Sequence, residues 1–131
     1  MAQETYPADL LYHAEHDWAR LEDDIATLGI TWHAQDALGE IVFFEPPAPG
    51  TQIAAGEPYT EVESVKAVSD VIAPVSGEIV EVNGDLVDSP EALNEDPYGA
   101  GWIVKIRVSD PSEQDALMDH ETYVASLATT A

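Results

Sequence analysis

Short segments rich in β-branched and aromatic residues, separated by glycine and proline, constrain the fold of this chain most. Such segments occur at 25–30, 40–45, 58–64, 68–73, 78–83 and 102–108. Glycines stand between or beside them, and Pro46-Pro47-Ala48-Pro49-Gly50 is a rigid loop. Many short strands joined by such turns are typical of a sandwich or a small barrel. We therefore expect a mainly β protein, and a length of 131 residues suits one domain.

The segment 102–108 alternates between apolar and charged residues, as a half-buried strand does. One face would carry Trp102, Val104, Ile106 and Val108, and the other Lys105 and Arg107. Those two cations are therefore expected on the solvent side of a strand. The other cations of the chain are Arg20, in a short segment after Trp18, and Lys66.

Capping residues predict a few short helices. Thr31 is a suitable N-cap for a helix through Leu38, which Gly39 would end. Ser89-Pro90-Glu91 reads as a cap followed by proline at the first helical position. Asp110-Pro111-Ser112-Glu113 is a variant of the capping box. Two helices would close the chain, from Pro111 to about Met118 and from about Glu121 to Leu127.

The charge balance is strongly acidic. The chain has 26 Asp and Glu against 4 Lys and Arg, a formal net charge of −22. A nucleic-acid backbone needs many more cations, so nucleic acid is excluded as a partner. With no cysteine, disulfides, thiolate metal sites and cysteine nucleophiles are excluded as well. No apolar run approaches the length of a membrane helix and no signal peptide is visible, so we expect a cytoplasmic protein that binds no membrane.

The sequence has no catalytic motif. A Gly-rich phosphate loop, a Gly-x-Ser-x-Gly elbow and a His-Glu-x-x-His helix are all missing. His13 and His16 have a spacing that could bind a metal, with Glu15 or Asp17 as a third ligand. No second motif supports such a site, and two surface imidazoles are the simpler interpretation. We therefore expect neither an enzyme nor a metal protein.

Lys66 is unusual because it lies among small and β-branched neighbours in the segment 61–71. A chain with so few cations keeps one here, and a lysine in a tight turn is open to a modifying enzyme. Valines at spacings of three and four, beginning with Val62 and Val65, favour an amphipathic helix. The valine content and Pro74 favour two strands around a turn. The residues alone leave both interpretations open.

The residues around Lys66 resemble a known motif. The run Glu63-Ser64-Val65-Lys66-Ala67-Val68-Ser69-Asp70-Val71 is similar to the lipoylation motif of the glycine cleavage system H proteins. Further blocks follow that family in order: Tyr12 to Trp18, Ala26 to Thr31, Ala34 to Val42, Ala73 to Asn83, Asn94 to Gly99, and Gly101-Trp102. The resemblance therefore runs from about Leu11 to Val124. It departs from the family at Trp32, where Asp is usual, and at Asp17, where Glu is commoner.

This resemblance implies a single lipoyl-carrier domain with a barrel–sandwich hybrid core at about 9–108 and helices at about 111–127. It also places Lys66 at the tip of a tight hairpin, which would make the helical spacing of the valines a false signal. Lipoate would be the covalent cofactor on Lys66, and the protein would carry rather than catalyse. The residues read during lipoylation would be Glu63, Ser64, Val65, Ala67 and Gly56.

The resemblance implies partners too. The carrier would take an aminomethyl group from the pyridoxal-phosphate enzyme glycine decarboxylase, pass it to the aminomethyltransferase, and be reoxidised by dihydrolipoyl dehydrogenase. A lipoate ligase or octanoyl transferase would attach the cofactor, and the chain itself would be a monomer. The loaded arm would dock in a cleft with Asp17 and Asp70, with Glu15 and His33 as further candidates.

Other carriers with a modified lysine fit less well. An H-like protein that acts mainly as a lipoate donor in lipoate assembly is the alternative, because it needs the same lysine and fold. Lipoyl domains of 2-oxo acid dehydrogenases usually have Asp-Lys-Ala at the lysine and lack the C-terminal blocks. Biotin carriers have methionines at the places of Val65 and Ala67.

Overall fold

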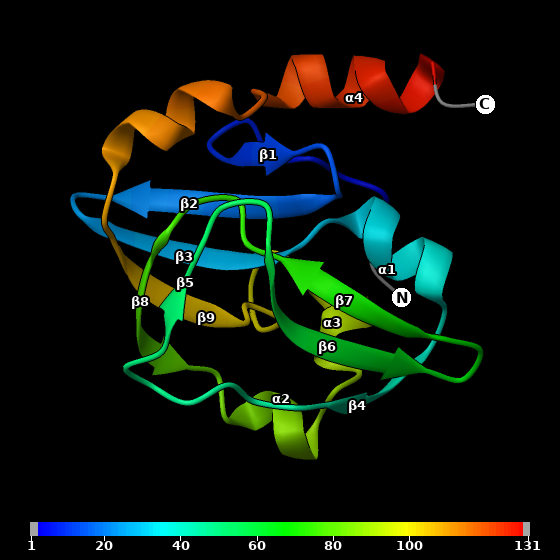
Figure 1. Ribbon diagram of the computed structural model, residues 1–131. Coiled ribbons are helices and arrows are strands. Elements are labelled where there is room, and N and C mark those ends of the chain that lie inside the picture. The colour runs from blue at the N-terminus through cyan, green and yellow to red at the C-terminus, as the bar shows by residue number, and fades with distance from the viewer. Residues whose placement is uncertain (1–2, 130–131) are drawn as a thin grey trace.

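The computed structural model describes residues 3–129, which form two antiparallel sheets with helices around them (Figure 1). The larger sheet has the strand order β1 (Leu11–His13), β2 (Asp17–Glu22), β3 (Ile25–Ile30), β9 (Val104–Val108), β8 (Gly77–Val82) and β5 (Gln52–Ile53). The smaller sheet has the order β4 (Ile41–Phe44), β6 (Pro58–Ser64) and β7 (Val68–Ile72). The helical elements are α1 (Trp32–Leu38), α2 (Asp85–Asp88), α3 (Ala92–Glu95), the 3-10 helix η1 (Pro111–Ala116) and α4 (His120–Thr129).

One apolar core lies between the two sheets. Leu28, Ile79 and Ile106 enter it from the larger sheet, and Val62 and Val71 from the smaller one. None of these side chains is more than 1% exposed. Burial of two apolar faces against each other is the main stabilisation of such a sandwich. The prediction of a mainly β fold is confirmed.

A second cluster of aromatic side chains fastens the C-terminal helix to the sheet. Tyr12 of β1 and Tyr123 of α4 are fully buried, and their rings stack 4.6 Å apart. The backbones of Tyr12 and Met118 also exchange two hydrogen bonds of 2.8 Å. Figure 1 shows α4 lying along the outside of β1 and β2. The last helix is therefore part of the fold and not a loose tail.

Gly29 is required where β3 passes Trp18 of β2. The two residues are paired across the strands, and a Cβ at position 29 would lie 2.6 Å from the indole ring. Because side-chain carbons cannot approach so closely, any larger residue would displace the buried Trp18.

The predicted helix after Thr31 is confirmed at both ends. Thr31 Oγ1 accepts a hydrogen bond of 3.2 Å from the backbone N–H of Ala34. Gly39 has a φ of 81° and donates its N–H to Gln35 at 3.0 Å. A left-handed residue of this kind ends a helix, and glycine adopts it without strain.

The other capping predictions are partly wrong. Helix α3 begins at Ala92, and Ser89 does not cap it, because a turn bonded between Ser89 O and Ala92 N (3.1 Å) comes first. Asp110 does cap the next element by accepting from Ser112 N at 3.1 Å. Glu113, however, accepts from the N–H and hydroxyl of Ser76 at 2.7 and 2.8 Å instead of closing a capping box.

The C-terminal helices also differ from the prediction in length. The first is a 3-10 helix that ends at Ala116, because Met118 is drawn into the pairing with Tyr12. The second is confirmed and begins one residue earlier than expected, at His120.

The cations of β9 lie where the alternation predicts. Val104 and Ile106 are buried, whereas Lys105 Nζ lies 4.0 Å from Glu81 and Arg107 Nε lies 3.9 Å from Asp24. The strands β1, β2 and β5 were not predicted from the sequence. Polar residues interrupt β2, and β5 has only two residues, so neither has a readable periodicity.

Candidate functional site

Lys66 lies in the tight turn between β6 and β7, so the hairpin interpretation is confirmed. Glu63 pairs with Val68 across the hairpin, and Ser64 N donates to Ala67 O at 2.8 Å. The helical spacing misled because Val65 and Val68, 66% and 60% exposed, do not belong to any buried face. The first and last valines of that series, Val62 and Val71, do enter the core.

Ser64 holds the turn in shape. Its hydroxyl oxygen accepts from the backbone N–H groups of Lys66 and Ala67 at 3.3 and 3.1 Å. Ser64 itself is only 5% exposed, so the pivot of the turn is fixed by the protein interior. Val65 N donates to Glu40 O at 3.0 Å, which ties the turn to the chain just before β4. The lysine backbone is therefore rigid while its side chain lies in solvent.

The Lys66 side chain lies beside the C-terminal end of α1. A Cβ placed on Gly39 would be 3.5 Å from Lys66 Cε. The lysine stem therefore passes within ordinary van der Waals distance of this position.

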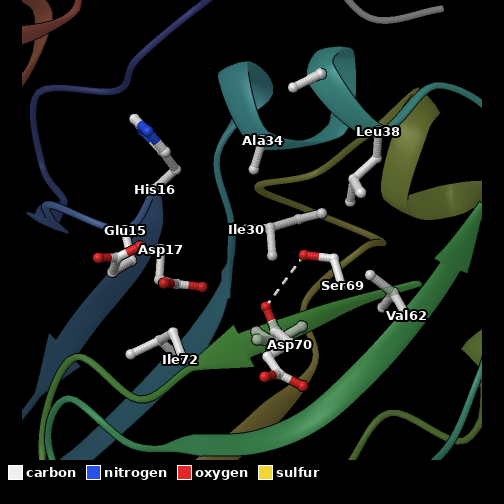
Figure 2. Close-up of a pocket in the computed structure, with 12 residues that line it drawn as sticks. Glu15, His16, Asp17, Ile30, Ala34, Leu38, Val62, Ser69, Asp70 and Ile72 are labelled. Carbon is white, nitrogen blue, oxygen red and sulfur yellow. Dashed lines mark hydrogen bonds between the residues drawn. The ribbon is translucent and has the colours of Figure 1, made fainter. Parts of the chain in front are cut away.

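A cleft of about 270 Å³ lies next to the hairpin, between α1, the start of β2, and β7 (Figure 2). Its walls combine apolar side chains with acids and one hydroxyl: Glu15, His16, Asp17, Ile30, Ala34, Ala37, Leu38, Val62, Ser69, Asp70, Val71 and Ile72. The lining includes three of the four residues expected at an arm-docking cleft. The fourth, His33, does not line it, but its ring lies 4.4 Å from that of His16.

Asp17 is the most unusual group in the cleft. The residue is 2% exposed, and its Oδ2 has no hydrogen-bond partner in the described part of the chain. Burial raises the pKa of its carboxyl well above the ordinary range, a backbone hydrogen bond from Ile72 opposes that rise, and nearby Glu15 adds to it. A cation that approaches such a buried carboxyl lowers its pKa again.

Glu15 and Asp70 are exposed and lie at the rim of the cleft. Figure 2 shows Ser69 directed toward Ile30, whereas the Asp70 carboxylate points to the opposite side of β7. The hydroxyl that faces the cleft is therefore that of Ser69, which was not among the predicted site residues. Alternation along a strand that begins at Val68 is the signal that could have identified it.

His16 connects the cleft to the aromatic cluster. It has a φ of 73°, and its Nδ1 lies 2.8 Å from Tyr123 OH, which lies 2.8 Å from Thr31 Oγ1 as well. Burial lowers the pKa of His16, and the neighbouring His33 lowers it further. The imidazole is therefore a neutral, fixed wall of the cleft. No sequence signal linked residues so far apart in the chain.

Two residues expected to take part in lipoylation lie apart from each other. Glu63 is exposed on β6, three residues before Lys66. Gly56, with a φ of 84°, lies in the turn at the other end of β6, so the length of that strand separates it from the lysine. Gly56 therefore does not adjoin the hairpin. Its positive φ accounts for glycine there.

Neither a metal site nor a membrane span is found among residues 3–129. No three His, Asp or Glu side chains in this range are grouped as metal ligands would be, His13 and His16 included. No helix in the same range is long and apolar enough to cross a membrane.

Two packed sheets with one lysine at the tip of a tight hairpin define a lipoyl-domain-like barrel–sandwich protein. Residues 10–130 match the family model described as glycine cleavage H-protein. The chain therefore belongs to the glycine cleavage H-protein family.

Known proteins of this kind are similar over nearly their whole length. The glycine cleavage system H protein of Rubrobacter xylanophilus is 53% identical over 92% of this chain and 94% of its own. That of Halorhodospira halophila is 54% identical over 89% of this chain and 91% of its own. A crystal structure of a glycine cleavage system H protein from Mycobacterium marinum superimposes with a TM-score of 0.84, at 39% identity over 94% of this chain and 99% of that one.

Proposed function

We propose that this chain is the lipoyl-bearing carrier of the glycine cleavage system, with the lipoyl group in amide linkage to Lys66. Lys66 is exposed on a rigid turn, beside a cleft lined by both apolar and polar side chains. This position supports the proposal most directly. The membership of the H-protein family supports it independently. The alternative, a protein that acts mainly as a lipoate donor, is not favoured by any of these observations.

The residues present suit such a group. The turn leaves the Lys66 side chain exposed and open to an acylating enzyme, and its stem passes beside Gly39. The cleft offers a buried, unpartnered carboxyl oxygen on Asp17. When bound, the lipoyl group supplies a disulfide that accepts an aminomethyl group and releases it again. The chain's own residues would have to position and protect that cargo.

Asp17 and Ser69 are the groups that would hold an ammonium ion in the cleft. The approach of a positive charge lowers the pKa of a buried carboxyl, so Asp17 would ionise as the ammonium arrives. The Ser69 hydroxyl adds an acceptor on the facing strand. Ile30, Ala34 and Leu38 form the apolar wall that would exclude water. Glu15 and Asp70, at the rim, would attract the cation rather than bind it closely.

The partners and the other expected properties of the protein are those of a carrier. Its partners would be glycine decarboxylase, the aminomethyltransferase, dihydrolipoyl dehydrogenase and a lipoate ligase or octanoyl transferase. A tethered arm raises the local concentration of its reactive end at each of them. We infer that the carrier has no catalytic activity of its own. A monomeric, cytoplasmic protein stays a prediction.

Lipoylation in vitro tests the attachment site. The chain is incubated with a lipoate ligase, lipoate and ATP, and its intact mass and peptides are measured. The wild type and Lys105→Arg, which changes another solvent-side lysine, should each gain one lipoyl group. Lys66→Arg should gain none, because a guanidinium stays protonated and is a poor acyl acceptor. Lipoate on Lys105, or none on the wild type, would refute the proposal.

A further inference from the structure

The most exposed large hydrophobic side chains include a group at the lysine hairpin and the neighbouring strand. Among the described residues they are Val42, Phe43, Val65, Val68, Val80, Val87 and Val124. The first four belong to β4, β7 or the turn that joins β6 to β7. Phe43, at 52% exposure, is the only aromatic one. Single exposed apolar residues are ordinary, but a group of them marks an interaction surface.

A β-bulge produces this exposure. Ile41 pairs with Ser64 and Phe43 with Glu63, so Val42 is one extra residue in β4. As a result, both Val42 and Phe43 are exposed between the buried Ile41 and Phe44. A bulge of this kind re-aims side chains and is common beside functional sites.

One row of paired residues across the small sheet contains Phe43, Glu63 and Val68. Phe43 pairs with Glu63, and Glu63 pairs with Val68, so all three side chains share a face. Phe43 and Val68 flank a shallow hollow of about 60 Å³, together with Glu45, Glu61 and Glu63. We call the set of Phe43, Val68 and these three acids the hairpin patch.

The acids of the hairpin patch have no cation partner within the described chain. The only two ion pairs between residues 3 and 129 join Lys105 to Glu81 and Arg107 to Asp24, both on the larger sheet. The patch is thus an apolar centre with an unneutralised acidic rim. Its complement is an apolar pocket edged with Lys or Arg, and such complementarity directs the encounter of two proteins.

The reach of the lysine indicates which partner this is. An unmodified lysine has only a four-carbon stem, so an enzyme that acylates Lys66 must bring its active site down onto the hairpin. Val68 lies two residues from Lys66, and Phe43 lies in the same row as Val68. Enzymes that act on the end of a finished arm can stay farther from this surface.

We propose that the hairpin patch is the docking surface for the enzyme that acylates Lys66, with the Phe43 ring as its apolar anchor. This inference rests on the proposed function only in taking Lys66 as the attachment site. The partner face that it requires is an apolar pocket with a basic rim.

Initial rates of lipoylation test this, with the unmodified chain as the varied substrate of a lipoate ligase. Phe43→Ala should raise KM about tenfold with little change in kcat, as loss of an interface anchor does. Phe43→Leu should restore most of the affinity. Val124→Ala, which removes another exposed hydrophobic side chain, on α4, is the control and should behave as wild type. Melting curves check that each variant is folded.

The charged rim is tested separately. The double variant Glu61→Gln, Glu63→Gln should weaken the salt dependence of kcat/KM, because fewer charges are then screened.

Prolonged incubation of Phe43→Ala with the ligase gives the fully lipoylated variant, which should accept the aminomethyl group at the wild-type rate.

Three outcomes would overturn the inference: a wild-type kcat/KM for Phe43→Ala, an equal loss for Val124→Ala, or normal lipoylation with slow transfer from glycine decarboxylase. The last would assign the patch to that enzyme instead. A wild-type chain that is never lipoylated would refute the proposed function, which is a different result.

Discussion

The buried carboxyl of Asp17 predicts an unusual dependence of stability on pH. Burial raises its pKa in the folded chain above the unfolded value. At a pH below the unfolded pKa both forms carry the proton, so the full stability of the folded chain is present there. It is lost as pH rises through the folded pKa. Asp17→Asn stays uncharged at every pH, so it should match the wild type in acid and exceed it in stability at neutral and alkaline pH.

The size of the effect follows from the partners of Asp17. One oxygen is hydrogen-bonded by the backbone of Ile72, and Oδ2 is buried without a partner. An unpaired buried polar group costs about 1–3 kcal/mol. Asparagine keeps the first bond and leaves its amide N–H groups unpaired, as the carboxyl leaves Oδ2, so this cost cancels and the gain is about 1 kcal/mol for each unit of difference between the folded and unfolded pKa. For a chain of this length, that raises Tm by roughly 3–5 °C.

Urea unfolding of wild type and variant at a series of pH values measures this difference directly. Other titrating groups are common to the two proteins and cancel in the comparison. Asp70→Asn, which removes an exposed carboxylate, is the control for the loss of one negative charge. A variant less stable than wild type at about pH 8, or a difference that is the same at every pH, would refute the reasoning.

Three further predictions concern cargo, salt and packing. In lipoylated carrier loaded with an aminomethyl group, Asp17→Asn should release formaldehyde about fivefold faster than wild type, which corresponds to a loss of about 1 kcal/mol. Asp70→Asn should have less effect, because its carboxylate points away from the cleft. Equal rates for all three proteins in a formaldehyde assay would contradict this prediction. Because a net charge of −22 repels itself, Tm should rise between low salt and about 1 M potassium chloride, and a level midpoint would exclude this explanation. Gly29→Ala should lower the free energy of unfolding by about 2–3 kcal/mol through its clash with Trp18, whereas Gly84→Ala, which meets open space, should change it little; similar urea midpoints would show that the indole can move.

The parts of the structure that were predictable are those fixed by neighbours in sequence. The helix after Thr31 is set by its own cap and by Gly39, and the sides of β9 are set by alternation. The hairpin at Lys66 was not predictable from periodicity, because Val65 is spaced like a core residue but lies in solvent. The H-protein resemblance, not the local pattern, selected the correct alternative.

The unpredicted parts depend on contacts between distant residues. Glu113 bonds to Ser76 instead of to its own helix, and His16 meets Tyr123 across most of the chain. The family resemblance implied Asp17 in the cleft, but the burial of its carboxyl was not predictable, since burial depends on how β2 and β7 pack. Strand alternation separates Ser69 from Asp70 only once the hairpin is known.

The burial of Asp17 also bears on how firmly a loaded arm can be held. Moving a carboxylate out of water costs energy that its attraction to an ammonium ion offsets only in part, so a buried ion pair has a small net strength. A fully exposed acid would give a similarly small value through screening, but it would leave the cargo open to water. In the cleft, the same carboxyl lies beside Ile30 and Ala34, which exclude water while the net attraction stays weak. A carrier needs both properties, because its cargo must survive between enzymes and yet leave the cleft readily at each of them.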